Sequence, residues 1–276
     1  MARCNPRLNS FAYLPVASLL PSLKAGPMRW DGLSLPLLFN LSLTTLQLSR
    51  LSHVGAKSLS NLLSLLEEDS LLENVSIDTN WLDEQICQLL GNVSRKAKRL
   101  QFASDGTRLT DSCITTLISL CESLEEFSLG DIQGNFRCGR LLCDPNSSAT
   151  GRLSKSIWEK VDDFPPSLRR FRIGISEATL QHSWAIDHLA SLRSLPLSTL
   201  THLSITRVCN PFQAQIHEVA SLKPVPEEFV RSLRAAKSLR YLTCDWWSWT
   251  AEALKTPMES CTSLRVSSYV ECLCLH

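Results

Sequence analysis

The sequence predicts an α/β protein assembled from a repeated unit of one short strand and one helix. Three observations lead to this fold class: leucine is unusually abundant, a six-residue apolar pattern recurs along the chain, and the apolar spacing changes between copies of that pattern. The chain holds 49 leucines among its 276 residues and only 10 glycines. Leucine at this level indicates a periodic structure, so the chain is first searched for internal repeats.

The repeated hexad has the form L-x-x-L-x-L with conservative apolar substitutions. Seven copies begin at Leu43, Leu72, Ala97, Leu124, Leu168, Leu200 and Leu239, and a degenerate copy begins at Leu264. Successive copies of the seven are 29, 25, 27, 44, 32 and 39 residues apart. Because the fourth and sixth residues of the hexad are apolar and the third and fifth are not, each copy predicts a short strand with one buried face.

Between the hexads the apolar spacing changes to that of a helix. Residues at i, i+3, i+4 and i+7 form an apolar stripe on one helix face. The stripes are Leu59, Leu62, Leu63 and Leu66, then Ile114, Leu117, Ile118 and Cys121, with less complete versions at Leu82, Ile86, Leu89 and Leu90 and at Phe229, Leu233 and Ala236. Thr110, just before Asp111, is the expected N-cap of the second helix.

A unit of one strand and one helix cannot bury its apolar face alone, so successive units must stack. The expected architecture is a solenoid over residues 43–276, with a curved parallel sheet on the concave face and helices on the convex face. Residues 1–42 are expected to form an irregular N-terminal cap or a remnant of another module. The 44-residue step predicts an inserted loop at about 130–165, ending in a short helix around Ile157, Trp158 and Val161. Such an insertion is either a tolerated surface loop or part of a binding face.

One run carries a more specific resemblance. Leu109-Thr-Asp-Ser-Cys-Ile-Thr-Thr-Leu-Ile-Ser-Leu-Cys-Glu-Ser-Leu-Glu-Glu-Phe-Ser-Leu129 places a cysteine three residues before a hexad, and Cys261 stands in the same relation to Leu264. From about residue 40 to 270 the chain resembles leucine-rich-repeat proteins, and more narrowly the cysteine-containing repeats of fungal F-box/leucine-rich-repeat receptors. An F-box is not recognisable in residues 1–42. The resemblance implies the substrate-recognition domain of a ubiquitin-ligase receptor.

Composition excludes several classes of function. The charges nearly cancel, with 28 Lys+Arg against 27 Asp+Glu, which disfavours a protein devoted to nucleic acid or anionic lipid. No run of apolar residues has the length of a membrane span. The 11 cysteines are an odd number without regular short spacings, so at least one thiol stays unpaired within the chain. This usage favours the cytoplasm or the nucleus.

Catalytic and metal-binding signatures are missing from the sequence. The chain has no P-loop, no G-x-S-x-G, no dinucleotide fingerprint and no H-E-x-x-H. The close cysteine pairs Cys138 with Cys143 and Cys272 with Cys274 lack the further ligands that a zinc site needs. Cys113, Cys121, Cys209, Cys244 and Cys261 occupy positions that favour small apolar residues, so they are interpreted as buried structural thiols. We therefore expect no enzyme activity, no cofactor and no metal.

The candidate binding residues lie at the third and fifth hexad positions, which alternate with the buried ones. Because Arg and Tyr are common interface anchors, the charged and aromatic members of this set are the candidates: Arg99, Glu126, Arg170, Arg172, His202 and Tyr241. Trp246 and Trp247 follow the Leu239 hexad directly. They either join this binding surface or pack at the edge of the core.

The expected function is a non-catalytic protein-binding module, monomeric outside its complex. In the first hypothesis the concave face holds a degradation substrate and the N-terminus contacts a cullin-ligase adaptor. The alternative is a stand-alone scaffold or inhibitor with no ubiquitin-ligase link, and a third possibility is a degenerate family member without a stable partner. A GTPase-stimulating protein of the same fold is disfavoured, because that type usually has more regular repeats and an acidic tail.

Overall fold

The computed structural model describes 11 segments of the chain. They are residues 10–13, 44–48, 56–66, 70–79, 82–103, 109–130, 157–161, 163–176, 191–208, 223–244 and 247–267. Within the expected cap, 1–42, they include one strand. Within the expected inserted loop, 130–165, they include Gly130 and the residues from Ile157 onward, except Asp162.

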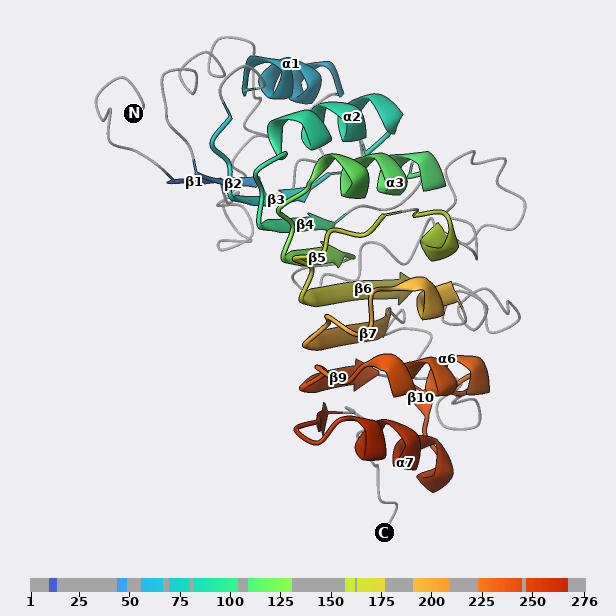
Figure 1. The fold of residues 1–276 in the computed structure, drawn as a ribbon. Coiled ribbons are helices and arrows are strands. Elements are labelled where there is room, and N and C mark those ends of the chain that lie inside the picture. The colour runs from blue at the N-terminus through green and yellow to red at the C-terminus, as the bar shows by residue number, and fades with distance from the viewer. Residues whose placement is uncertain are drawn as a thin grey trace, which may run out of the picture.

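A nine-stranded sheet forms the centre of the protein, and all its strands run parallel in chain order (Figure 1). The strands are β1 (Ser10–Tyr13), β2 (Thr45–Leu48), β3 (Asn74–Asp78), β4 (Arg99–Ala103), β5 (Glu126–Leu129), β6 (Arg170–Ser176), β7 (His202–Val208), β9 (Tyr241–Cys244) and β11 (Arg265–Ser267). A separate parallel pair is formed by β8 (Lys223–Pro224) and β10 (Trp247–Ser248). The predicted α/β class with a parallel sheet is confirmed.

The described helices all lie on one side of this sheet (Figure 1). They are α1 (Ala56–Leu66), α2 (Glu84–Val93), α3 (Asp111–Leu120), α6 (Glu227–Ser232) and α7 (Ala251–Ser260), with 3₁₀ turns η6 (Ile157–Glu159), η7 (Leu192–Ser194) and η8 (Leu233–Ala235). Among the described residues, none of these helices has the length and apolar character that a membrane crossing requires.

The predicted apolar stripes face the sheet. Leu59, Leu62 and Leu63 of α1 are buried, as are Ile114, Leu117 and Ile118 of α3. Thr110 is the N-cap of α3, as predicted, because its side chain accepts a hydrogen bond from the backbone N–H of Cys113. Asp83 caps α2 in the same way through the N–H of Ile86. These caps satisfy backbone donors that the first helical turn leaves free.

The hexads set the register of the sheet. In all seven complete copies the strand begins at the third hexad residue, and the fourth residue is buried. The second residues of successive copies are linked by the backbone. The carbonyl of Glu73 accepts hydrogen bonds from Lys98 and Arg99, and the carbonyl of Lys98 accepts from Glu125 and Glu126. The same pattern of backbone hydrogen bonds continues to β9. It fixes the turn that precedes each strand, which we call the lead-in turn, against the lead-in turn of the preceding unit.

An aromatic cluster fills the core where the inserted loop returns to the sheet. Trp158 of η6 packs edge-to-face on Phe171, with ring centroids 4.9 Å apart, and Phe127 stacks on Phe171 at 5.7 Å. These three side chains are at most 1% exposed. Trp158 therefore supplies, from a short 3₁₀ turn, the apolar cover that α1, α2 and α3 supply elsewhere.

Gly130 directly follows the last residue of β5. Its φ is +142°, and a Cβ atom added there would lie 2.9 Å from the backbone nitrogen of Gly174. Both the backbone angle and the close approach of β6 require a glycine.

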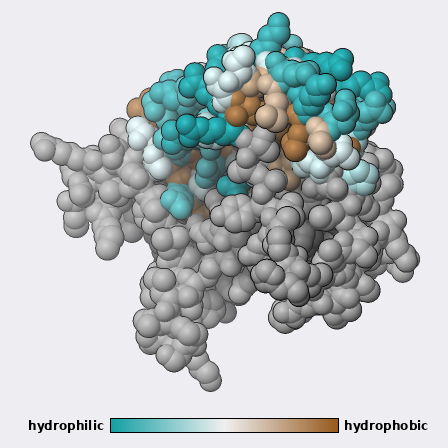
Figure 2. All heavy atoms as spheres, turned by 90° about the horizontal axis from the view of Figure 1, so that it is seen from below, coloured by the Kyte–Doolittle hydropathy of each residue, from teal (hydrophilic) through white to brown (hydrophobic). Residues whose placement is uncertain are grey.

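The core extends to the last strand. Leu264, which directly precedes β11, is partly buried against the core cluster. Seen from the C-terminal end of the sheet, the described atoms are mainly hydrophilic, with a small hydrophobic area between them (Figure 2). Helix α7, which the sequence analysis did not predict, covers this end of the core through buried Pro257 and partly buried Ala253.

Candidate functional site

The sheet face opposite the helices carries two aligned rows of polar side chains, which we call the polar face. The first row contains the third hexad residues Thr45, Asn74, Arg99, Glu126, Arg170, His202 and Tyr241, which are direct partners on neighbouring strands. The second row contains the fifth residues Gln47, Ser76, Gln101, Ser128, Arg172, Ser204 and Thr243. The six predicted residues from Arg99 to Tyr241 therefore lie on five adjacent strands of one face.

Glu126 lies at the centre of the first row, between two arginines. Its Oε2 is 3.6 Å from Nε of Arg99 and 3.6 Å from Nη1 of Arg170. The arginine side chains remain 58% and 52% exposed, whereas Glu126 is 21% exposed. Ion pairs with exposed partners contribute little to stability. The main effect is on charge, because one carboxylate shared by two guanidinium groups leaves this cluster with a net positive charge.

His202 and Tyr241 form an aromatic pair next to Arg170. Their rings stack with centroids 4.4 Å apart and an interplanar angle of 19°. Oγ1 of Thr201 lies 2.8 Å from Nδ1 of His202, and Tyr241 is 43% exposed. This pair presents a flat, rigid aromatic surface beside the charged cluster.

The environment of His202 favours the uncharged imidazole. Partial burial lowers the pKa of His202 below its ordinary value of 6.5, and the positive charges of Arg170 and Arg240 lower it further, while Glu126 acts in the opposite direction. Burial and neighbouring cations both disfavour the protonated ring. At neutral pH the ring is therefore a neutral hydrogen-bonding group rather than a cation.

Positive charge gathers on the later strands. Among the described residues, Arg172 on β6 and Arg240, just before β9, have no carboxylate partner. The earlier lead-in cation Lys98, in contrast, pairs with Glu73 at 3.2 Å. The sequence analysis missed Arg240, because it examined only the third and fifth hexad positions. A change of charge at the second hexad position could have indicated Arg240. This position holds the charged residues Glu73, Lys98 and Glu125 before the inserted loop, and Arg169, Thr201 and Arg240 after it.

The structure does not describe the side chains of the two predicted tryptophans. Trp246 lies outside the described residues, and Trp247 belongs to β10, where the structure describes the backbone only. The cysteine pairs considered for zinc, Cys138 with Cys143 and Cys272 with Cys274, also lie outside the described residues, as does Cys209. Within the part of the chain that the structure describes, no three His, Cys, Asp or Glu side chains gather where they could hold a metal ion.

The remaining predicted structural cysteines are buried. Cys113, Cys121, Cys244 and Cys261 form no disulfide bond and are at most 2% exposed, and Cys87 is equally inaccessible. Burial raises the pKa of the Cys121 thiol to about 12, and the Cys261 thiol donates a hydrogen bond to the carbonyl of Ala236 at 2.9 Å. Cys121 and Cys261 therefore act as small apolar residues. The pKa of the Cys113 thiol is instead lowered to about 6, mainly by its hydrogen bond with Cys87, although Cys113 is fully buried.

Comparison with known proteins places the chain in no family: no family model matches it, and no curated protein matches it significantly.

Proposed function

We propose that the chain is a leucine-rich-repeat solenoid that binds another protein through its polar face and catalyses no reaction itself. The parallel strands in chain order and the helices on one side support the solenoid. So does the shared hexad register, because each unit buries its apolar residues only against its neighbours. The curvature expected of such a stack makes the polar face the concave one.

The observation that carries the proposal is the first row of the polar face. Seven side chains are aligned across seven strands, a span of about 29 Å at ~4.8 Å per strand, which suits a protein segment better than a small molecule. The row contains exposed arginines and an exposed tyrosine fixed by stacking on His202. Arg and Tyr are enriched in protein interfaces and in their energetic hot spots. A rigid sheet holds them with little loss of entropy on binding.

The more specific form of this proposal is a ubiquitin-ligase substrate receptor. In it the polar face would hold the degradation substrate, and the N-terminal segment 1–42 would contact a cullin-ligase adaptor. The competing form is a stand-alone scaffold or inhibitor with the same binding face. The buried free thiols support a reducing compartment, the cytoplasm or the nucleus, for either form.

The experiment is affinity capture of the full chain from cells, with the partners identified by mass spectrometry. The variant Arg170→Glu with Arg172→Glu reverses the polar face at its most basic strand. Its matched control, Arg95→Glu with Lys96→Glu, makes the same charge change in the exposed turn after α2. We expect a specific partner to be lost from the first variant by tenfold or more and to be retained by the control.

The same capture separates the two forms of the proposal. A cullin-ligase adaptor that is retained by both variants supports the receptor, because the adaptor would bind away from the polar face. A specific partner without any adaptor supports the scaffold. If both variants retain every specific partner of the wild type, the polar face is not the binding surface and the proposal is wrong.

A further inference from the structure

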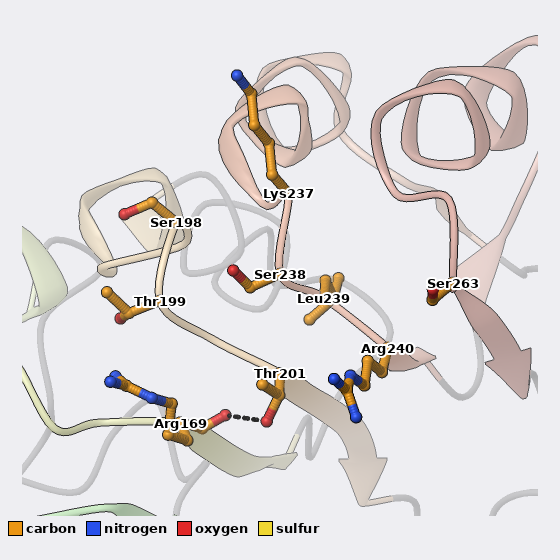
Figure 3. A pocket seen from close by; sticks show the side chains of 9 residues that line it. All are labelled: Arg169, Ser198, Thr199, Thr201, Lys237, Ser238, Leu239, Arg240 and Ser263. Atoms are coloured by element: carbon orange, nitrogen blue, oxygen red, sulfur yellow. Dashed lines mark hydrogen bonds between the residues drawn. The ribbon is translucent and has the colours of Figure 1, made fainter.

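A polar pocket lies at the end of the sheet where β6, β7, β9 and β11 begin (Figure 3). Its volume is about 430 Å³. It is lined by Arg169, Ser198, Thr199, Thr201, Lys237, Ser238, Leu239, Arg240 and Ser263. Figure 3 shows that these side chains come from the lead-in turns of successive units, with the Ser238 hydroxyl between Thr199 and the start of β9.

The lining residues occupy equivalent places in successive units. Thr199, Ser238 and Ser263 each stand immediately before a first hexad residue, and Arg169, Thr201 and Arg240 are second hexad residues. The backbone bonds from Thr201 to Arg169 and from Arg240 to Thr201 hold these turns in register, at 2.8 and 2.9 Å. The pocket is therefore a product of the repeated turn and has a fixed shape.

Among the described residues, the charged side chains that line the pocket, Arg169, Lys237 and Arg240, are all positive. Within the described part of the chain, neither Lys237 nor Arg240 has an acidic partner, although Arg193 and Arg231 nearby are both paired with glutamates. Figure 3 shows the Lys237 side chain extended away from Arg240, with Ser238 between the two, so an anion at Ser238 would be attracted from both sides. The positive charge of Arg240 also lowers the pKa of His202, which reports the same field on the adjoining polar face.

The hydroxyl groups divide into fixed and free donors. Oγ1 of Thr199 donates to the carbonyls of Leu168 and Pro196, and Oγ1 of Thr201 donates to the carbonyl of Arg169. The hydroxyls of Ser198, Ser238 and Ser263 make no hydrogen bond to any described residue. Figure 3 shows these three serines in a row on successive turns, with Ser238 in the middle, so Ser238 is the hydroxyl that can donate to an anion between Lys237 and Arg240.

We propose that this pocket binds a phosphate monoester group, with Lys237 and Arg240 compensating its charge and Ser238 donating a hydrogen bond. A phosphate monoester at neutral pH carries more negative charge and more acceptor oxygens than a carboxylate, so it uses more of these donors. The guanidinium of Arg240 can hold two of its oxygens at once. The pocket volume leaves room for part of the molecule that carries the phosphate.

The site is separate from the residues tested under the proposed function. Arg170 and Arg172 do not line the pocket, so binding of phosphate and binding of a protein to the polar face can fail independently. The two sites adjoin, however, because Arg240 directly precedes Tyr241 of the first row. A phosphorylated serine or threonine of a bound protein could reach the pocket, and so could a free phosphate ester.

The test is binding to the full chain, measured by ³¹P NMR line broadening and calorimetry at constant ionic strength. The probes are inorganic phosphate, phosphoserine blocked at both ends, and blocked serine. The pocket variant is Lys237→Gln with Arg240→Gln. The control, Lys96→Gln with Arg234→Gln, removes the same charges from exposed residues outside the pocket. All four side chains are exposed, and an unchanged circular dichroism melting curve verifies that each variant folds.

We expect blocked phosphoserine to bind, blocked serine not to bind, and the pocket variant to bind phosphoserine at least tenfold more weakly, a loss of about 1.4 kcal/mol. The control should stay within twofold of the wild type. If blocked phosphoserine binds more tightly than inorganic phosphate, this points to a phosphorylated protein as the source of the phosphate group. If the two probes bind equally, this points to a free phosphate ester. The proposal is overturned if no phosphate probe binds, or if the control weakens binding as much as the pocket variant.

Discussion

The two halves of the sheet solve the same packing problem in different ways. From β2 to β5 the hexads are 25 to 29 residues apart and helices of 10 or 11 residues cover the sheet. From β6 to β9 the spacing rises to 32 and 39 residues, and the degenerate copy before β11 follows after 25 residues. Among the described residues, the cover there includes the 3₁₀ turns η6, η7 and η8, the six-residue α6 and the ten-residue α7.

The surface chemistry changes at the same place. In the earlier half the charged lead-in residues Glu73, Lys98 and Glu125 alternate in sign, and Lys98 pairs with Glu73. In the later half Arg172, Lys237 and Arg240 have no acidic partner among the described residues, and the aromatic pair of His202 and Tyr241 lies between them. The regular half contributes Arg99 and Glu126 to the polar face, whereas the irregular half contributes the cations without an acidic partner and the aromatic pair.

The largest effect is expected from breaking the regular half. Leu117→Asp places a carboxylate at a fully buried position of α3, where it has no partner. We expect a loss of about 4 kcal/mol or more in the free energy of unfolding, since both the packing and the solvation of the charge are lost. Chemical denaturation followed by circular dichroism measures it. Ser119→Asp, on the exposed side of the same helix, should change stability by less than about 0.5 kcal/mol. Equal stability of the two variants would contradict the register assigned to α3.

A smaller effect is expected at the junction of the halves. Gly130→Ala forces a side chain onto a backbone with φ of +142° and against Gly174 of β6. We expect a destabilisation of about 1–3 kcal/mol, measured by the same denaturation. Gly91→Ala is the comparison, because its added Cβ would meet the side chain of Leu120, which can change rotamer more easily than a backbone can move. A Gly130→Ala chain as stable as the wild type would mean that β5 and β6 do not approach as described.

The polar face can be tested one strand at a time. Arg172→Glu in the later half should weaken partner binding about tenfold, or about 1.4 kcal/mol, because it removes a cation without a carboxylate partner and adds a repelling charge. Gln47→Glu occupies the same row on β2 and should leave the affinity within twofold. Surface plasmon resonance with the captured partner compares them. If Gln47→Glu is the more damaging substitution, the binding half has been assigned to the wrong end of the sheet.

The smallest effect concerns the ionisation of His202. The pKa of His202 lies below its ordinary value of 6.5 in the folded chain. At pH values between the lowered pKa and 6.5, the unfolded chain therefore binds the proton more readily than the folded chain does. Stability due to this group is therefore constant above pH 6.5 and decreases as the pH falls toward the lowered pKa. NMR titration of the imidazole should give a pKa below 6.5, and His202→Gln should lack this part of the acid destabilisation. A titration midpoint above 6.5 would show that Glu126 dominates over Arg170 and Arg240.

The sequence predicted the register of the sheet because one repeated pattern determines it. The third and fifth residues of seven hexads face away from the helices, and the candidates from Arg99 to Tyr241 followed directly from that alternation. The prediction needed no tertiary information, since an error of one residue would have exposed Leu100, Phe127 and Phe171 together.

Other features could not be read from periodicity. Helix α7 has a single fully buried residue, Pro257, within its span, so its sequence has no apolar stripe. The sequence predicted a short helix around Ile157, Trp158 and Val161, and the structure has the 3₁₀ turn η6 there, but the packing of Trp158 on Phe171 was not predicted. The residues of the pocket occupy equivalent places in the repeat, since Ser198 and Lys237 each stand two residues before a hexad, but the repeat pattern does not show that a cavity forms between these turns. Stacking of units brings these turns together, so the cavity becomes visible only in the folded protein.

The central claim, that a protein partner lies along the later half of the polar face, is tested most directly by photo-crosslinking in cells. A benzophenone amino acid would replace Ser204 on β7, Gln47 on β2, or Ser119 on the outer side of α3. We expect the chain substituted at Ser204 to crosslink to the partner that the variant Arg170→Glu with Arg172→Glu no longer captures. We expect no such crosslink from the chain substituted at Ser119. Crosslinks to that protein from Ser119, with none from Ser204, would contradict the account.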